Sequence, residues 1–194
     1  MHVLHICNDF FSSKVHANLY RELDNLDVEQ SVYATCTVAE LFGHNEFNSK
    51  HTKFIHGLLL KKRHKYLFHY KVLAVFLDLC RKVKLKKIDI LYATTLFSDG
   101  AVAHLVHCIY RKPYIVAVRG TDVNIYLAKL KHTWLVGHRV LLGAEQIIFI
   151  TPSMLQIFVS HPFIKRILPK IEHKFVIQPN GIDNYWIDNV KREQ

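Results

Sequence analysis

The chain has 194 residues, of which half are hydrophobic, and it carries a formal net charge of +10. Its length suits one domain with a full core, and its hydrophobic content excludes an intrinsically disordered chain. No uncharged apolar run approaches the roughly 18 residues that span a bilayer, and the N-terminus enters a strand pattern without a basic leader or a cleavage site, so we expect a cytoplasmic protein.

Short apolar strands alternate with helical patterns from the N-terminus onward. Residues 3–7 form a predicted strand, 8–14 a polar loop and 15–26 a predicted helix, because apolar residues recur there at helical spacing. A second strand is expected at 29–35. After an irregular connection, a short strand is expected around residues 54 and 55.

A long helix is predicted between Lys61 and Lys87, within a strongly basic segment. Its expected buried stripe consists of Leu67, Val72, Val75, Phe76, Leu79 and Val83. Twelve of the 26 Lys and Arg residues, but only one of the 16 acidic residues, lie between Lys50 and Lys87, so this segment accounts for the whole positive balance.

This basic segment suggests contact with an anionic membrane surface or a polyanion. Interleaved aromatic residues favour a membrane surface, and no nucleic-acid-binding motif accompanies them, so no nucleic-acid partner is expected. The alternative is a cationic face that is merely solvated. The membrane-surface candidates are Lys61, Lys62, Arg63 and Lys65.

The second half of the chain continues the alternation. Strands are expected at 88–93, 114–118, 146–150 and 174–178, with helices at 100–110, from 123 to about 142, and after Thr151. Ser98 or Asp99 is expected to cap the first of these helices, and Thr151 the last. The whole pattern predicts an α/β fold: a Rossmann-like, doubly wound, mostly parallel sheet of about seven strands with helices on both faces.

The most informative stretch runs from Pro113 to Asn124. Its apolar, mostly β-branched run is typical of a strand covered on both faces. Arg119, Gly120, Thr121 and Asp122 follow at once, and the glycine is expected to allow a tight turn or a close approach to a ligand. Ligands bind outside the carboxyl ends of strands in open α/β sheets, so these residues are candidates for a binding cleft.

Other polar residues follow other strands and are expected at the same edge of the sheet. The cleft candidates are Asp9, Thr95, Asp99, Arg119, Gly120, Thr121 and Asp122. Ser12, Ser13 and Lys14 precede a helix, where they either bind an anion through backbone N–H groups or simply cap the helix. Arg119 either pairs with a phosphate or carboxylate, or bridges to Asp122 or Asp99 within the protein.

Several familiar sites are absent from the sequence. The first loop lacks the glycines of a dinucleotide fingerprint, and neither a P-loop nor a nucleophile elbow is present. The four cysteines are too far apart for a metal clip or a disulfide framework. His104 and His107 share a helix face but lack a third ligand at suitable spacing, so we expect no metal and no cofactor, with the histidines solvated or capping helices.

Five stretches together resemble the N-terminal domain of GT-B-fold retaining glycosyltransferases of family 4, also called group 1. They are residues 3–6, 88–93, 113–122, 147–151 and, most specifically, 177–183 with the sequence Ile-Gln-Pro-Asn-Gly-Ile-Asp. The resemblance implies a domain over residues 1–179 and a linker that begins at 180–194, with Asn180 and Gly181 in the interdomain turn, where Asn-Gly favours positive φ. It also implies that a C-terminal nucleotide-sugar domain is absent from this chain.

The resemblance further implies a transferase that moves a sugar from a nucleotide sugar to a glycan or lipid-linked acceptor, in cell-surface polysaccharide or glycolipid synthesis. The nucleotide sugar is then a co-substrate, and this half of the enzyme is expected to be inactive alone. Ser12, Ser13 and Lys14 match the loop that approaches the donor diphosphate, although many relatives have Gly-Gly there. Arg119 matches a position that is often histidine, so its implied role is positive charge rather than that of a histidine.

Two other functions stay open at this point. One is a non-catalytic α/β binding or regulatory domain, such as a flavodoxin-like module, although the sequence shows neither a flavin phosphate loop nor an acidic receiver-type pocket. The other is a peripheral module that binds an anionic membrane or polyanion through the basic segment.

Overall fold

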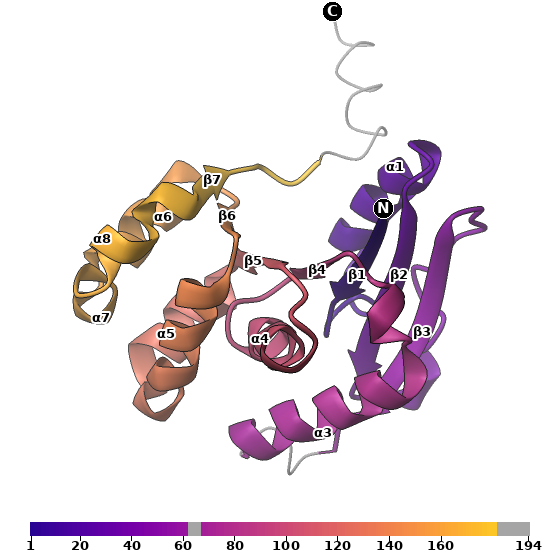
Figure 1. Cartoon of the computed structure of the whole chain (residues 1–194), viewed down its shortest axis with the longest axis horizontal. Coiled ribbons are helices and arrows are strands. Elements are labelled where there is room, and N and C mark those ends of the chain that lie inside the picture. Colours follow the sequence, from indigo (N-terminus) through magenta and orange to yellow (C-terminus); the bar gives the residue numbers. More distant parts are fainter. Residues whose placement is uncertain (62–66, 182–194) are drawn as a thin grey trace, which may run out of the picture.

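A computed structural model describes residues 1–61 and 67–181, which form an all-parallel sheet of seven strands (Figure 1). The spatial order of the strands is β3-β2-β1-β4-β5-β6-β7. The strands are β1 (His2–Ile6), β2 (Glu29–Cys36), β3 (Thr52–Leu59), β4 (Ile90–Ala93), β5 (Tyr114–Val118), β6 (Gln146–Phe149) and β7 (Phe175–Ile177). The predicted α/β fold class is therefore confirmed.

Helices cover both faces of this sheet. They are α1 (Val15–Asn25), α3 (Phe68–Lys82), α4 (Ser98–Tyr110), α5 (Trp134–Gly143), α6 (Pro152–Ser160), α7 (Pro162–Lys165) and α8 (Leu168–Ile171). Short 3-10 segments lie at Ala39–Leu41, Leu85–Lys87, Lys131–Thr133 and Glu172–Lys174. Figure 1 shows α1 on one side of the sheet and α3, α4 and α5 on the other.

The core consists of two clusters of buried side chains, one on each face. The larger cluster joins the strands to α3, α4 and α5. The smaller cluster lies under α1 and contains Phe10, Phe11 and Tyr20. Alternate residues of β2 enter different clusters, since Tyr33 belongs to the larger one and Val32 to the smaller one. This is the period of two that a strand buried on both faces requires.

The long helix predicted between Lys61 and Lys87 is shorter than expected at its C-terminal side, where α3 ends at Lys82 and a 3-10 segment covers Leu85–Lys87. Helix α3 begins at Phe68, and Leu67 is 55% exposed rather than part of the buried stripe. The other five predicted members of that stripe are buried: Val72, Val75, Phe76, Leu79 and Val83. Lys62, Arg63 and Lys65 lie outside the described residues, whereas Lys61 is exposed. No helix in the described parts of the chain is long and apolar enough to cross a membrane.

Two predicted helix starts differ from the structure and one agrees. Helix α4 begins at Ser98 with no side-chain cap, so neither Ser98 nor Asp99 is its N-cap. The helix predicted from residue 123 is divided into a π-helical segment, Asp122–Leu127, a short 3-10 turn and α5. The cap at Thr151 is confirmed, because its Oγ1 accepts a hydrogen bond from the Met154 backbone N–H at 3.2 Å.

Gly120 and Gly181 were both expected at turns that favour glycine, but neither has the left-handed backbone conformation that would require one. Gly120 and Gly181 both lack a positive φ, and the same is true of Asn180. A Cβ at Gly120 would meet only Asn124 Nδ2, at 3.8 Å. Gly120 therefore makes no left-handed turn, and the expectation that Asn180-Gly181 takes positive φ is wrong.

Candidate functional site

The candidate site lies where the chain reverses its direction across the sheet. From β1 the chain builds outward to β2 and β3, and from β4 it builds the opposite way, so β1 and β4 are neighbours. Ile6 and Ala93 pair at the last positions of these two strands. The loops that follow them, beginning at Cys7 and Thr94, diverge there, and such a divergence is the usual ligand site of an open α/β sheet.

A pocket of about 430 Å³ opens beside this point. Helix α1 forms one wall, and Tyr92, Arg119 and Ile148 from the central strands form the floor. Gln178, Pro179, Asn180 and Gly181 form the other wall. The structure thus brings three sequence-predicted residues, Arg119, Asn180 and Gly181, to one pocket that α1 completes.

Arg119 is held across this pocket by neutral oxygen atoms. Its Nε donates to the Thr94 carbonyl at 3.1 Å, and its Nη1 donates to Asn180 Oδ1 at 2.9 Å. Among the described residues, its guanidinium makes no ion pair with Asp122 or Asp99. The alternative of an ion pair from Arg119 to Asp122 or Asp99 is therefore not found in the described part of the chain, although the charge of Arg119 helps to lower the pKa of Asp9.

Asp122 does not line the pocket, and its side chain instead joins the loops that follow β4 and β5 through hydrogen bonds. It is fully buried, and its two carboxylate oxygens accept backbone N–H bonds from Leu96, Phe97 and Arg119 at 3.0, 3.1 and 2.9 Å. Burial raises the pKa of Asp122 to about 6, although the three N–H bonds and the charge of Arg119 act against that rise. This contact pattern makes Asp122 a structural support for the site rather than a surface for ligand.

Asp99 is buried on the other face of β4, in a polar network. Its Oδ2 accepts from Thr94 Oγ1 at 2.8 Å and from Thr95 Oγ1 at 3.1 Å. Burial raises its pKa to about 7, with the nearby Asp9 adding to the effect and the threonine bonds and Lys71 opposing it. A carboxyl with such a pKa can exchange a proton near neutrality.

Lys71 from α3 belongs to the same buried region. Its Nζ donates to Ser98 Oγ at 2.8 Å, and Ser98 Oγ lies 3.1 Å from Tyr126 Oη. Burial lowers the pKa of Lys71, and the charge of Asp99 opposes that shift. Asp99 is only 3% exposed and lines a small cavity together with Cys7, Lys71 and Ser98.

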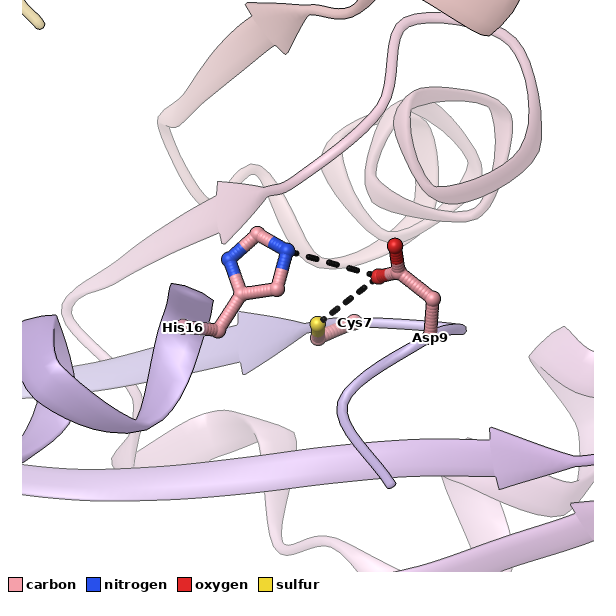
Figure 2. A group of neighbouring side chains, drawn as sticks. All are labelled: Cys7, Asp9 and His16. Carbon is pink, nitrogen blue, oxygen red and sulfur yellow. Dashed lines mark hydrogen bonds and ion pairs between the residues drawn. The ribbon is translucent and has the colours of Figure 1, made fainter. Parts of the chain in front are cut away.

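Asp9 lies between a thiol and an imidazole at the end of β1 (Figure 2). Its Oδ1 accepts from Cys7 Sγ at 3.4 Å and lies 3.4 Å from His16 Nε2. Burial alone would raise the pKa of Asp9, but its bonds to His16 and Cys7 and the charge of Arg119 together lower it. Asp9 is therefore held as a carboxylate on the edge of the candidate site.

The loop of Ser12, Ser13 and Lys14 was expected either to bind an anion through its backbone N–H groups or to cap helix α1, and its hydrogen bonds fit neither expectation. The backbone N–H groups of Ser12 and Ser13 both donate to the Asp9 carbonyl at 3.0 Å. Helix α1 begins at Val15 with no side-chain cap, so simple capping does not describe the loop either. Lys14 is exposed. An anion would have to displace the two hydrogen bonds to Asp9 before it could use those N–H groups.

Thr95 and Thr121 differ in what they offer. The Thr95 hydroxyl donates to Asp99 Oδ2 at 3.1 Å and accepts from the Asp99 backbone N–H at 3.2 Å. Thr121 is exposed at the start of the π-helical segment. The roles proposed for these residues, for Gly120 and for the loop before α1 stay predictions.

Sequence reasoning missed Cys7, His16, Tyr92 and Lys71 as members of the site. The spacing of the four cysteines indicated no metal clip, and the histidines were expected to be solvated or capping. His161 does cap α7, but His5 and His16 are buried at 2% and 5% exposure. The only available signal was that His16 lies in the first turn of the helix after Asp9, on the face that carries Tyr20.

Comparison with known proteins supports the fold and not a family. No protein-family model matches the chain, and no curated protein matches it by sequence. Solved structures do match: Anabaena HepE in complex with UDP has a TM-score of 0.58 at 13% identity and covers 94% of this chain and 45% of HepE.

Two further structures give the same result. Acinetobacter baumannii MurG matches with a TM-score of 0.55 at 16% identity over 94% of this chain and 46% of MurG. Arabidopsis thaliana UGT89C1 complexed with UDP matches with a TM-score of 0.52 at 11% identity over 100% of this chain and 56% of UGT89C1. The chain thus spans about half the length of these structures. It has the fold of one half of a GT-B glycosyltransferase, of the kind that forms the N-terminal domain.

Proposed function

We propose that this chain is the acceptor-side, N-terminal half of a glycosyltransferase that uses a nucleotide-sugar donor. We assign it to the retaining, family 4 type, with a glycan or lipid-linked acceptor in cell-surface polysaccharide or glycolipid synthesis. The observation that carries the proposal is the pocket beside the β1–β4 divergence, where Arg119 lies against the Asn180 turn. The structural neighbours crystallised with UDP support a nucleoside-diphosphate donor.

Arg119 has the central role in this proposal. Among the described residues, its guanidinium hydrogen-bonds to a carbonyl and an amide oxygen and makes no ion pair, so an incoming phosphate or acidic acceptor would gain a charged partner without breaking one. Asn180 belongs to the turn that would lead to the second domain. Closure of the two domains on substrate would therefore reach Arg119 directly.

The first test is the reading frame beyond Gln194 in the source DNA. We expect it to continue for about one more domain, on the order of 150 residues, with a second alternation of strands and helices. A stop codon directly after Gln194 would contradict an enzymatic role for the chain and favour a binding module.

The second test uses the full-length protein and a panel of UDP-, GDP- and ADP-sugars, with release of nucleoside diphosphate as the readout. Arg119→Gln should lower kcat/KM by about tenfold or more, since it removes a charged partner worth roughly 1.5–3 kcal/mol. Arg166→Gln, which changes an exposed arginine away from the pocket, is the matched control. Equal activity of the two variants would exclude the assigned role of Arg119.

A specific surface favours a second property, docking on an anionic membrane at the cytoplasmic face. Leu67, Tyr70, Leu73 and Leu77 are 45–55% exposed and recur at helical spacing along α3. Arg81 continues the same line four residues after Leu77, and Lys84, Lys86 and Lys87 follow it, all exposed. An apolar stripe that ends in a cationic cluster matches the interfacial region of an anionic bilayer.

Vesicle co-sedimentation tests this docking. We expect the chain to bind vesicles with anionic lipid and not purely zwitterionic ones. Leu73→Gln with Leu77→Gln should abolish binding, and reversal of Lys61, Lys62, Arg63 and Lys65 to glutamate should weaken it. Leu135→Gln, at another exposed leucine, is the control. Binding that survives both sets of changes would leave the segment as a solvated cationic face.

A further inference from the structure

Cys7, Asp9 and His16 bring three different metal-ligating groups to one point at the end of β1 (Figure 2). Cys7 directly follows the strand, Asp9 lies in the loop, and His16 lies in the first turn of α1. One ligand atom from each residue can be chosen so that all three lie within 4.8 Å of one another. Among the described residues, no other group of three or more His, Cys, Asp or Glu side chains meets this distance condition.

Two of the three separations between these ligand atoms match those of a tetrahedral zinc site. Ligands bonded to a tetrahedral Zn²⁺ at 2.0–2.3 Å lie about 3.3–3.8 Å from one another. Asp9 Oδ1 lies 3.4 Å from Cys7 Sγ and 3.4 Å from His16 Nε2. The third pair, Cys7 and His16, lies within 4.8 Å, so these two side chains would have to approach each other by at most about 1 Å to bind one ion.

The donor set also selects the kind of metal. A thiolate, a carboxylate and a neutral imidazole balance the charge of one divalent cation, which makes a neutral site in a largely buried place. Sulfur and imidazole ligands suit Zn²⁺ rather than Mg²⁺ or Ca²⁺, which prefer oxygen. Cys7 is fully buried and His16 is 5% exposed, whereas the Asp9 side chain is 47% exposed and leaves a path for entry.

A second observation comes from Tyr20, which packs beside the cluster. Its ring is stacked 6.2 Å from the His16 ring, and its buried hydroxyl makes no hydrogen bond of good geometry among the described residues. Burial raises the pKa of Tyr20, and the neighbouring Cys7 adds to that rise through its charge and a weak hydrogen bond. A metal-bound thiolate is a better acceptor than a thiol, so metal binding would strengthen this contact of the buried hydroxyl.

We propose that Cys7, Asp9 and His16 form a binding site for Zn²⁺ or a similar divalent transition metal. Three protein ligands leave a fourth position for water or an oxygen of a ligand. His16 also lines the 430 Å³ pocket, whereas Cys7 and Asp9 are not among its lining residues. The sequence pattern did not suggest this site, because its expectation of no metal was based on His104 and His107.

Cobalt titration of the 194-residue chain tests the site without any need for enzymatic activity. After treatment with a chelator, the chain should bind one Co²⁺ with a thiolate-to-metal charge-transfer band, and Zn²⁺ should displace it. Cys7→Ser should remove that band. Asp9→Asn and His16→Asn should each weaken binding by about tenfold or more.

The controls separate this site from other thiols. Cys36→Ser changes a buried cysteine outside the cluster, and Cys108→Ser removes an exposed thiol whose Sγ lies 3.5 Å from His104 Nε2. Both should keep the charge-transfer band. Loss of the band in Cys108→Ser with its retention in Cys7→Ser, or the absence of any such band in wild-type protein, would overturn the proposal.

The Asp9→Asn variant separates a loss of metal binding from a loss of folding. Asp9→Asn changes a partly exposed side chain, and circular dichroism before metal addition should match that of the wild type. A folded Asp9→Asn variant with unchanged Co²⁺ affinity would also overturn the assignment. The readout is independent of sugar transfer, so failure of the metal site leaves the proposed transferase function unaffected.

Discussion

At the scale of single residues, the two buried aspartates near the strand ends, Asp122 and Asp99, have different roles. Asp122 accepts three backbone N–H bonds, which offset the desolvation cost of burying its carboxylate. Asp99 accepts two threonine hydroxyls and its pKa rises to about 7. The same side chain thus serves as a fixed support in one place and as a titratable group in the other.

The raised pKa of Asp99 gives the folded state a pH dependence. The ordinary carboxyl pKa is 3.8, so the folded chain holds this proton more tightly than the unfolded chain. The associated stability is fully present below about pH 4 and is lost as pH rises through 7. Lys71 from α3 and Asp9 from the loop are the charged groups that act on Asp99.

Asp99→Asn should therefore raise the free energy of unfolding at pH 8 by roughly 1–4 kcal/mol, with little change at pH 4. The amide oxygen can still accept from Thr94 and Thr95. Urea unfolding at both pH values is the measurement, with Glu172→Gln as an exposed control. A stabilisation that is equal at the two pH values would exclude titration of Asp99 as its cause.

Asp122→Ala should lower the free energy of unfolding by about 3 kcal/mol or more, because three backbone N–H groups lose their acceptor and each unmade bond costs roughly 1–3 kcal/mol. Asp89→Ala is the matched control, since exposed Asp89 accepts one backbone bond, from His2 at 2.7 Å. Chemical denaturation of both variants compares the two. Equal losses would mean that the three bonds of Asp122 add nothing beyond those of a surface carboxylate.

At the scale of elements, close packing of α4 against α5 depends on two glycines. An added Cβ at Gly100 would lie 2.9 Å from Val140 Cγ1, and one at Gly137 would lie 2.7 Å from the Phe97 ring. Phe97 is fully buried and stacks on Tyr126 with ring centroids 4.8 Å apart. The ring therefore has little room to move away.

Gly137→Ala should consequently destabilise the protein by roughly 1–2 kcal/mol, although alanine favours helix over glycine by about 1 kcal/mol. Gly120→Ala, where the nearest atom is 3.8 Å away, should be neutral or slightly stabilising. Thermal unfolding measures both. A gain in stability for Gly137→Ala would show that Phe97 repacks freely.

The sequence allowed prediction of the elements better than of the site. Unbroken apolar runs such as Tyr114–Val118 mark buried parallel strands, because burial on both faces leaves no polar alternation. Leu67 was misplaced because helical spacing alone does not show where a helix begins. The partners of Asp122 and the meeting of Cys7 with His16 depend on how loops turn after the strands, and local sequence does not encode that.

At the scale of the whole molecule, the sheet joins two cores of unequal size. Strand β2 supplies side chains to both cores, since Tyr33 enters the larger one and Val32 the smaller one, while β1 supplies Leu4 to the larger core and Cys7, directly after β1, enters the smaller one. On the α1 side, Ile90, Tyr92, Ile115 and Val176 belong to neither cluster and are only partly buried. That face of β4 to β7 is thus less covered than the other.

Because β2 contributes to both cores, we expect unfolding of one core to disrupt the other. The 194-residue chain should therefore show one calorimetric transition, with equal calorimetric and van't Hoff enthalpies. Phe10→Ala, in the smaller core, should shift that single transition downward, as expected for a loss of about 3–5 kcal/mol. Leu135→Ala, at an exposed site on α5, is the control. Two separate transitions, with only the lower one moved by Phe10→Ala, would show instead that the α1 side folds as an independent unit.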